Sequence, residues 1–307
     1  MSFSVTILGS SSAKPTPERH HSAQVVNIEE QYFLVDGGEG VQRQMFRYGF
    51  NPLKLRAIFV SHLHADHVYG VFPLLSTMSL YGRKTALKVY APAPFGAMLE
   101  SYMSFFGGDM SYTVEWCEVD TTTSQVIFEN RTLEVISLPL RHRMPTAGYL
   151  FREKVPPLNV DKFKIEKYGL GIAQITAAKR GEDVTLESGE VVPNAQLTYT
   201  PFVPRSYGYV SDTNYSAKVA ALCHGVDMLY HEATYLHIEH KMSKARGHST
   251  ALEAAKCATV SEAKHLIIGH FSTRYKDLKP LLAEAQTQFK NTDLAIEGHT
   301  FEIEKQR

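Results

Sequence analysis

The sequence has few cysteines and no long apolar run. Its three cysteines, Cys117, Cys223 and Cys257, are scattered and form no CxxC pair, which argues against a disulfide framework and fits a reducing compartment. No apolar stretch approaches the roughly 20 residues that a membrane helix needs. Residues 1–9 carry neither a basic segment nor a cleavable apolar core, so nothing in them directs export. We therefore expect a cytoplasmic protein without a membrane span.

The sequence also lacks a net charge. Its 32 lysines and arginines cancel 32 aspartates and glutamates at pH 7. Without a global positive field the chain is a poor candidate for a general coat on DNA or RNA, and a nucleic-acid substrate would need a local basic patch. The 307 residues, 44% hydrophobic and 21% charged, describe a globular protein of one elaborate domain or two ordinary ones.

Strand-like and helix-like segments alternate along most of the chain. Strands are predicted, from β-branched and aromatic residues between turn signals, over residues 4–8, 23–28, 32–35, 55–60, 87–90, 207–210, 227–230 and 265–268. Helices are predicted over residues 41–48, 68–81, 94–105, 215–223 and 250–258, the last of them capped by Ser249. This alternation indicates a layered α/β architecture.

Residues 152–200 have a different texture from the rest of the chain. This stretch is rich in proline, glycine and charge, as in residues 154–157 (KVPP), 168–171 (YGLG) and 179–182 (KRGE), and its hydrophobic periodicity is weak. We interpret the segment as an inserted arm rather than as part of the core.

The most informative motif is HLHADH at residues 62–67, directly after the apolar run 57–60. Imidazole nitrogens and carboxylate oxygens are ligands that zinc prefers outside thiolate sites. Four such side chains in six residues, on a loop at the end of a strand, can divide between two ions, and two-metal centres commonly hydrolyse phosphate esters. A surface turn with chance histidines is the alternative, and the density of potential ligands argues against it.

Further polar residues follow other apolar strands and could complete such a centre. His142 comes after residues 135–140, Asp212 after residues 209–211, and His270 after residues 265–269. A carboxylate such as Asp212 can bridge two cations through its two oxygens. Each residue taken alone could equally be a polar surface residue, but the recurrence of the pattern favours a metal site.

These residues together resemble the metal centre of the metallo-β-lactamase superfamily. A narrower resemblance, to the ribonuclease Z (tRNase Z) family of tRNA 3′-processing endoribonucleases, covers nearly the whole chain. It is carried by residues 34–42 (LVDGGEGVQ), 62–70 (HLHADHVYG), 211–213 (SDT), 231–234 (HEAT), 248–250 (HST) and 269–275 (GHFSTRY). The resemblance implies a single domain over residues 1–307 with the metallo-β-lactamase-like four-layer αβ/βα sandwich, in which residues 152–200 form an inserted flexible arm that binds tRNA.

The family pattern also implies roles for particular residues. It assigns one zinc ion to His62, His64 and His142, the other to Asp66, His67 and His270, and the bridge to Asp212. Outside the ligands it implies that Asp36 orients a ligand histidine through its free ring nitrogen, and that two further residues form a supporting pair, His231 and Glu232. Two zinc ions per subunit are expected, with manganese as a possible substitute.

The resemblance implies a phosphodiester hydrolysis in which the metals lower the pKa of a water molecule. Asp66 would accept the proton of that water, and His248 would protonate the leaving oxygen or stabilise the transition state. The alternative for His248 is an ordinary histidine at a helix start. The products would be a tRNA with a 3′-hydroxyl and a trailer with a 5′-phosphate. Four basic residues are candidates for binding substrate phosphates: Arg19, Lys179, Arg180 and Arg274.

The chain departs from the family pattern in two places. Its arm reads Gly-Leu-Gly-Ile at residues 169–172, without the Gly-Pro element that relatives often carry. Residues 13–22 read AKPTPERHHS where many relatives have a Pro-x-Lys-x-Arg-Asn-type loop. Arm geometry and discrimination against mature CCA ends therefore do not follow from the resemblance.

Two rival functions are open to the same residues. One is another hydrolase on this scaffold, acting on a small phosphodiester, a sulfate ester or a lactam. The other is a binding protein that keeps the metal site as a structural or RNA-docking element. The resemblance favours an enzyme that cleaves precursor tRNA and implies a homodimer in which one subunit's arm serves the other's site.

Overall fold

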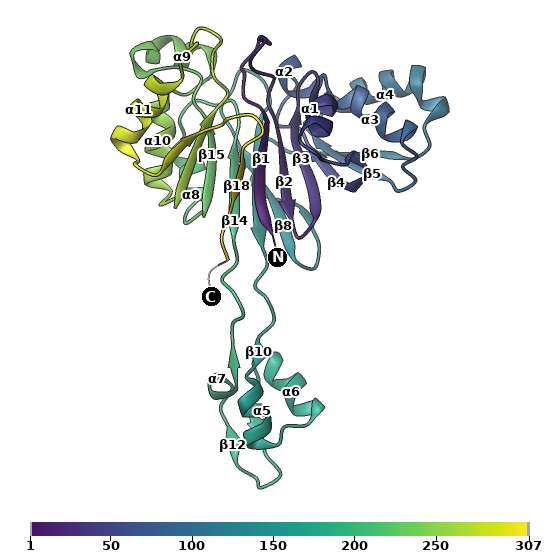
Figure 1. Ribbon diagram of the computed structural model, residues 1–307, viewed down its shortest axis with the longest axis vertical. Helices are drawn as coiled ribbons and strands as arrows, with labels where there is room; N and C mark the ends of the chain where they lie inside the picture. The colour runs from purple at the N-terminus through teal and green to yellow at the C-terminus, as the bar shows by residue number, and fades with distance from the viewer. Residues whose placement is uncertain (1, 306–307) are drawn as a thin grey trace.

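The computed structural model describes residues 2–305, which form two facing β-sheets with helices on their outer sides (Figure 1). The seven strands of the first sheet lie in the order β18 (Thr300–Glu302), β1 (Phe3–Gly9), β2 (Ala23–Ile28), β3 (Gln31–Gly37), β4 (Leu55–Phe59), β5 (Leu87–Ala91) and β6 (Val114–Glu118). Neighbours are antiparallel from β18 to β3 and parallel from β3 to β6.

The second sheet is also mixed. Its strands lie in the order β17 (Thr292–Leu294), β16 (His265–Gly269), β15 (Met228–Glu232), β14 (Ser206–Val210), β9 (Ala147–Glu153), β8 (Leu133–Pro139) and β7 (Val126–Glu129). Strands β14 to β17 run parallel, and β14, β9, β8 and β7 are antiparallel neighbours. Each sheet therefore brings the carboxyl ends of parallel strands to one edge, where loops can carry polar side chains.

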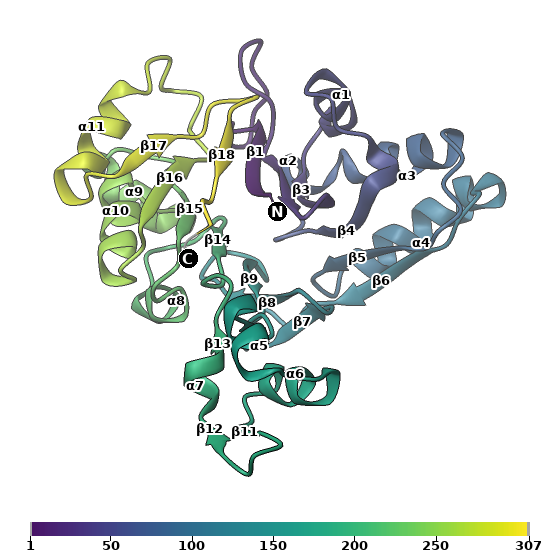
Figure 2. The same ribbon diagram turned by 60° about the horizontal axis from the view of Figure 1, so that its bottom comes forward.

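Helices cover the outer faces of both sheets (Figure 2). On the first sheet they are α1 (Val41–Arg47), α2 (Ala65–Val68), α3 (Val71–Leu80) and α4 (Phe95–Phe106), and on the second α8 (Ala217–Leu222), α9 (His240–Arg246), α10 (Ala251–Val260) and α11 (Lys279–Gln288). Three short 3₁₀ turns link elements: Pro52–Lys54, Gly107–Asp109 and His237–Glu239. The result is the predicted four-layer αβ/βα sandwich. Among residues 2–305, no helix is long and apolar enough to cross a membrane.

The hydrophobic pattern of the strands explains the layers. Phe33, Val35 and Phe59 point into the core between the sheets, whereas Leu34 and Ile58 pack on the outer side against the helices. Alternate residues of a strand face opposite sides of its sheet, so β3 and β4 are apolar on both faces because both faces are covered. Burying both faces fixes the register of these strands, since a shift by one residue would exchange two differently packed surfaces.

The predicted strands and most predicted helices are confirmed, but two details of the helices were wrong. The expected helix over residues 68–81 is instead two helices, α2 and α3, separated at Gly70. Its N–H donates to the carbonyl of Gly37, and a Cβ at Gly70 would lie 2.0 Å from the carbonyl oxygen of Gly38, so the close backbone approach that divides the helices requires glycine. The cap of α10 is Thr250, which forms a capping box with Glu253.

Residues 154–204 leave the sandwich between β9 and β14 and form a separate small unit, hereafter the arm (Figure 1). Its elements are β10 (Asn159–Val160), α5 (Lys162–Tyr168), α6 (Ile172–Lys179), β11 (Val184–Thr185), β12 (Val191–Val192), α7 (Asn194–Leu197) and β13 (Thr198–Tyr199). A small core holds them together, made of Val160, Leu170, Ala178, Val184, Val192 and Leu197. At the base of the arm, Arg205 and Glu153 form a buried ion pair at 2.6 Å.

Candidate metal centre

Side chains from the four segments that follow β4, β8, β14 and β16 meet at one edge of the sandwich. His62 and His64 lie in the loop after β4, and Asp66 and His67 lie in the first turn of α2. His142, Asp212 and His270 follow β8, β14 and β16. Their donor atoms converge in two groups, His62, His64, His142 and Asp212 in one and Asp66, His67 and His270 in the other, and Oδ1 of Asp212 lies 3.2 Å from Nε2 of His270. A third convergent set joins Asp212 and His270 to His248.

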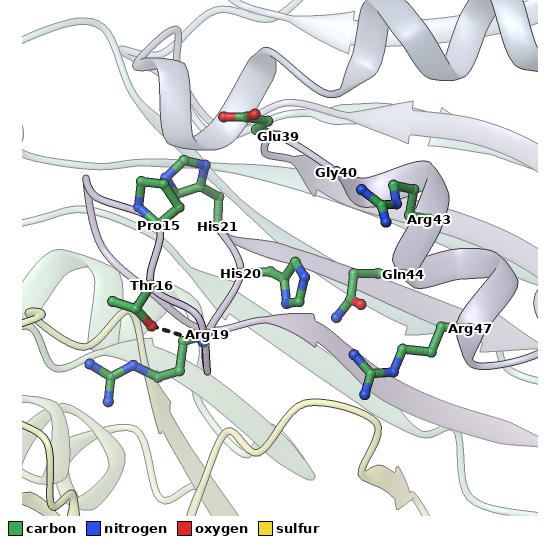
Figure 3. Close-up of a pocket in the computed structure, with 10 residues that line it drawn as sticks. All are labelled: Pro15, Thr16, Arg19, His20, His21, Glu39, Gly40, Arg43, Gln44 and Arg47. Carbon is green, nitrogen blue, oxygen red and sulfur yellow. Dashed lines mark hydrogen bonds between the residues drawn. The ribbon is translucent and has the colours of Figure 1, made fainter.

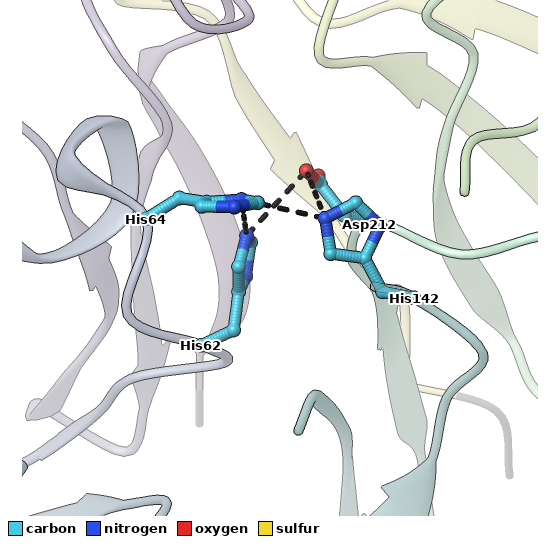
Figure 4. Close-up of side chains that lie close together, drawn as sticks. All are labelled: His62, His64, His142 and Asp212. Atoms are coloured by element: carbon cyan, nitrogen blue, oxygen red, sulfur yellow. Dashed lines mark hydrogen bonds and ion pairs between the residues drawn. The ribbon is translucent and has the colours of Figure 1, made fainter. Parts of the chain in front are cut away.

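The first group comprises three histidines and one oxygen of Asp212 (Figure 4). Nδ1 of His64 lies 2.9 Å from Nε2 of His62 and 3.3 Å from Nε2 of His142. Oδ2 of Asp212 lies 3.5 Å from Nε2 of His62 and 3.9 Å from Nε2 of His142. Four donor atoms on four side chains thus converge on one small volume.

The second group comprises Asp66, His67, His270 and the other oxygen of Asp212. Nε2 of His270 lies 3.2 Å from Nε2 of His67, 3.4 Å from Oδ2 of Asp66 and 3.2 Å from Oδ1 of Asp212. Nε2 of His67 lies 3.6 Å from each of the two carboxylate oxygens. Asp212 therefore contributes one oxygen to each group, which is the arrangement expected of a bridging carboxylate.

Hydrogen bonds on the far side of three of the ligand rings fix which nitrogen faces the centre. Nδ1 of His142 donates to the carbonyl of Gly247 at 2.8 Å, and Nδ1 of His67 donates to Oδ2 of Asp36 at 2.7 Å. Nδ1 of His270 donates to Oγ1 of Thr234 at 2.9 Å, because that hydroxyl itself donates to Glu232. These bonds leave the Nε2 lone pairs directed at the centre, as ligation of a metal requires.

Asp36 is the most heavily bonded of these supporting groups. Besides His67, it accepts hydrogen bonds from the backbone N–H of Ser61 at 2.7 Å, from Oγ of Ser61 at 2.9 Å and from the hydroxyl of Tyr209 at 2.6 Å. Oγ of Ser61 in turn lies 3.0 Å from Nδ1 of His62. One buried carboxylate thus positions a histidine of each group.

The charges of the second group balance one another. Burial opposes a charge on His67, but Asp212, Asp66 and Asp36 raise its pKa to about 10. Burial raises the pKa of Asp66 and of Asp212, yet the facing histidines hold both well below their usual range. Three buried carboxylates require positive charge at this point, which a proton on His67 or a cation among the ligands can supply.

His248 is held by a second buried carboxylate, Glu232. Oε1 of Glu232 accepts from Nδ1 of His248 at 3.1 Å and from the backbone N–H groups of Ser249 and Thr213, and Oε2 accepts from Thr234. Burial works against a charge on His248, but Glu232 and Asp212 raise its pKa to about 9. The ring is therefore positioned beside the centre and protonated at neutral pH.

The backbone adopts uncommon conformations at this edge. Asp36 and His270 have φ angles of 55° and 57°, in the left-handed region that residues other than glycine rarely adopt. Gly247 has a φ of 77°, and a Cβ there would lie 2.7 Å from Nδ1 of His142. Residues held in this region tend to occur where function dictates geometry, and here they position two ligands and one supporting carboxylate.

The remaining predicted site residues lie apart from the two groups. Nδ1 of His231 bonds the carbonyl of Glu232 and, within residues 2–305, no hydrogen bond joins His231 to a ligand. The Arg19 guanidinium donates to the carbonyl of Tyr275 at 3.0 Å. Arg274 pairs with Glu239 at 2.8 Å, and in the arm Arg180 pairs with Glu182 at 2.7 Å while Lys179 lies at the end of α6.

Sequence reasoning missed three supporting residues: Ser61, Thr234 and Gly247. Ser61 directly precedes the HLHADH motif and Thr234 ends the HEAT motif, but their roles depend on contacts with Asp36 and His270, which are distant in sequence. Ser249 was wrongly predicted to cap α10; its hydroxyl instead donates to the carbonyl of Thr213. The signal that could have found them is proximity to the ligand motifs, since supporting residues commonly flank the ligands they orient.

The donor set fits divalent cations such as zinc. A tetrahedral zinc ion with bonds of about 2.0–2.1 Å to nitrogen separates its donors by about 3.3 Å. Neighbouring donor atoms within the two groups, such as Nδ1 of His64 with Nε2 of His62 and Oδ2 of Asp212 with Nε2 of His142, lie 2.9 to 3.9 Å apart. Moreover, Oδ1 of Asp212 is buried without a hydrogen-bond partner within residues 2–305, as expected of an atom that faces a cation.

The four-layer sandwich and its shared His/Asp centre define a metallo-β-lactamase-fold protein with a site for divalent metal. A family model described as "Anti-Pycsar protein Apyc1" matches residues 3–142. The chain is 40% identical to Ribonuclease Z of Phocaeicola vulgatus over 98% of each chain, and 40% identical to Ribonuclease Z of Porphyromonas gingivalis over 96% of this chain and 97% of that one. It is also similar to the crystal structure of the short form of human tRNase Z, with a TM-score of 0.70 and 25% identity over 98% of this chain and 99% of that one. The chain belongs to the ribonuclease Z family.

Proposed function

We propose that this chain is a metal-dependent endoribonuclease that removes the 3′ trailer from precursor tRNA, leaving a 3′-hydroxyl on the tRNA and a 5′-phosphate on the trailer. The observation that carries the proposal is the sharing of Asp212 between two convergent groups of donor atoms. Relatives at 40% identity over almost their full length bear the name Ribonuclease Z, which supports the same activity.

We assign one zinc ion to His62, His64 and His142 and a second to Asp66, His67 and His270, with Asp212 contributing to both and manganese as a substitute. When bound, two such ions supply a nucleophile at neutral pH and offset the charge on the phosphoryl oxygens. The fit of the donor distances to tetrahedral ligation supports this assignment.

Two side chains handle protons in this proposal. Oδ2 of Asp66, which accepts a hydrogen bond from the backbone N–H of Ala13 at 2.6 Å, takes a proton from the attacking water. Because its pKa lies below the usual range, Asp66 releases that proton to solvent rather than keeping it. His248, with its pKa raised to about 9, is protonated and donates to the 3′-oxygen that leaves. Glu232 holds His248 in place for this step.

The arm is proposed to bind the substrate away from the cleavage point. Its extension from the sandwich supports such a role (Figure 1). Residues 154–204 contain six basic and six acidic residues, so their net charge is zero and binding must depend on local groups such as Lys179 and Arg180. Arg180 is engaged with Glu182, so we expect Lys179→Gln to weaken tRNA binding at least as much as Arg180→Gln.

We also propose a homodimer in the cytoplasm. Helices α3 and α4 contain a single charged residue, Glu100, and they expose large apolar side chains: Tyr81, Leu80, Phe105 and Phe106. Exposed large apolar side chains of this kind are typical of an interface. We expect light scattering to give the mass of two chains, and Phe105→Ser with Phe106→Ser to give the mass of one.

A small-phosphodiester hydrolase is the competing function. The family match over residues 3–142 ends before Asp212 and before the arm, so it does not bear on the features that separate the two functions. The purified chain should be incubated with one precursor tRNA, with and without chelator, and the cut mapped to one nucleotide. We expect one cut, at the junction between the tRNA and its 3′ trailer, that is lost when the chelator is added. Hydrolysis of bis(p-nitrophenyl) phosphate without any cut in the precursor would favour the competing function.

A further inference from the structure

A cavity of about 460 Å³ lies beside the metal centre, between residues 15–21 and α1 (Figure 3). Its volume is within the range of small-molecule binding sites. Gly38 connects it to the centre, because a Cβ at Gly38 would lie 2.2 Å from Cβ of His21, which lines the cavity, and 2.5 Å from the carbonyl oxygen of Asp66. The cavity and the second ligand group are therefore neighbours separated by one glycine.

His21 is buried in the wall of this cavity with its hydrogen-bonding capacity unused. The residue is only 6% exposed, and neither ring nitrogen makes a hydrogen bond of good geometry within residues 2–305, although the backbone of Ala13 is near. A buried polar group without a partner costs free energy, so such groups are rare unless a ligand or water completes them. His21 thus marks the cavity as a place where a polar ligand binds.

Three arginines, Arg19, Arg43 and Arg47, line the cavity and give it a positive charge. Arg43 and Arg47 are one helical turn apart on α1 and line the same wall, and neither forms an ion pair within residues 2–305. Like charges at this spacing repel each other. The neighbouring carboxylate of Glu297 is occupied by His20 and Gln44, and Glu39 is the only acidic residue among the described residues that line the cavity. A bound phosphate would relieve the repulsion.

We propose that this cavity binds a nucleotide of the substrate strand adjacent to the cleaved phosphodiester. Arg43 and Arg47 contact the phosphate of that nucleotide, and His21 hydrogen-bonds its sugar or base. The inference rests on the proposed function, and it adds to the metal centre a second contact point that orients the RNA strand across Gly38. The chemistry required of the ligand is an anionic phosphate attached to a polar nucleoside.

The test is steady-state cleavage of one precursor tRNA by the full-length, metal-loaded protein. Arg43→Gln with Arg47→Gln removes both charges and retains side-chain length. We expect its KM to rise about tenfold near 0.1 M salt. A plot of log KM against log salt concentration should become less steep by about 0.7, the value for the loss of one single-strand phosphate contact. The loss on bis(p-nitrophenyl) phosphate, which carries no second phosphate for Arg43 and Arg47 to contact, should be smaller. The matched control is Arg56→Gln with Arg131→Gln. Both arginines are exposed and lie near the first residues of β4 and β8, whereas the metal ligands follow the last residues of these strands, so this variant should cleave like the wild type.

His21→Phe preserves the ring and removes its nitrogens, and we expect it to raise KM for the precursor without changing the salt dependence. Equal KM values for the wild type and the double arginine variant would overturn the subsite while leaving the proposed function intact. A wild-type protein that cleaves no precursor would remove the proposed function and the subsite with it. Arginine-dependent inhibition by uridine 5′-monophosphate, with unchanged KM for the precursor, would show a free-nucleotide site and overturn the proposal.

Discussion

The sandwich and the arm are built in opposite ways. The sandwich buries aromatic side chains such as Tyr149 and Tyr209 between two seven-stranded sheets and holds its site through chains of buried hydrogen bonds. The arm has a core of six small apolar residues, two-residue strands and exposed apolar side chains such as Phe163 and Ile172. Precise positioning of donor atoms needs a tightly packed structure such as the sandwich. Contact with a large substrate needs only an element that extends far enough from the core. This contrast supports the proposal that the sandwich carries out the chemistry and the arm binds the substrate.

The largest expected effect comes from replacing Asp212, the residue whose two carboxylate oxygens face the two ligand groups. Asp212→Asn keeps the size of the side chain but removes the charge and one of the two acceptor oxygens. Metal assistance contributes several kcal/mol to the transition state, and about 1.4 kcal/mol corresponds to a factor of ten. We therefore expect kcat to fall by at least about 1,000-fold on both precursor tRNA and bis(p-nitrophenyl) phosphate. A variant impaired on only one of the two substrates would contradict the assignment of chemistry to the sandwich.

Removal of the arm should reduce cleavage of precursor tRNA much more than hydrolysis of bis(p-nitrophenyl) phosphate. Residues 155–203 can be replaced by a short Gly/Ser turn because Ser206 of β14 already pairs with Arg152 of β9. Keeping Glu153 and Arg205 preserves the buried ion pair at the base. We expect kcat/KM on precursor tRNA to fall on the order of 100-fold through lost phosphate contacts, with turnover of the small diester within about threefold of wild type. Equal losses on both substrates would contradict the division of labour.

A smaller effect is expected from replacing Asp36, which belongs to neither ligand group but accepts a hydrogen bond from the ligand His67. Asp36→Asn retains one acceptor oxygen but removes the charge that faces Nδ1 of His67. Outer partners of this kind typically contribute 10- to 100-fold in metal affinity or activity. Competition with a chelator should show about that loss of affinity. An unchanged affinity would mean that His67 does not depend on its carboxylate partner.

The smallest effects compare one helix cap in each region. Thr250 caps α10 in the sandwich and Asp161 caps α5 in the arm, each through a side-chain oxygen. Replacing either by alanine should cost about 1 kcal/mol of local helix stability. We expect Thr250→Ala to lower the free energy of global unfolding, and Asp161→Ala to speed hydrogen exchange in the arm alone. Slower global refolding or a lower melting temperature for Asp161→Ala would show that the two regions unfold together.

Much of this organisation could be predicted from local sequence. The strands were predictable because apolar β-branched residues alternate between turn signals, and the ligands were predictable because they follow those strands directly. The division at Gly70 was not predictable, because it depends on the contact of that residue with Gly37 and Gly38, about 30 positions earlier. The apolar pattern of residues 68–81 continues through the break and hides it.

The supporting contacts were less accessible than the ligands. The resemblance to a family points to Asp36 and Glu232, but the partners that orient the rings of His142 and His270 are a glycine carbonyl and a threonine hydroxyl, which carry no chemical signature. The cavity beside the centre is equally invisible in the sequence. The cavity forms only when the loop of residues 15–21 folds against helix α1, which brings their side chains together.

Metal stoichiometry is the most direct measurement of the central claim, which is that seven side chains hold two divalent ions through a shared Asp212. The full-length protein should be saturated with zinc, freed of excess ion and analysed for metal per chain. We predict two equivalents for the wild type and fewer than two for Asp212→Asn. One equivalent or none in the saturated wild-type protein would contradict the account.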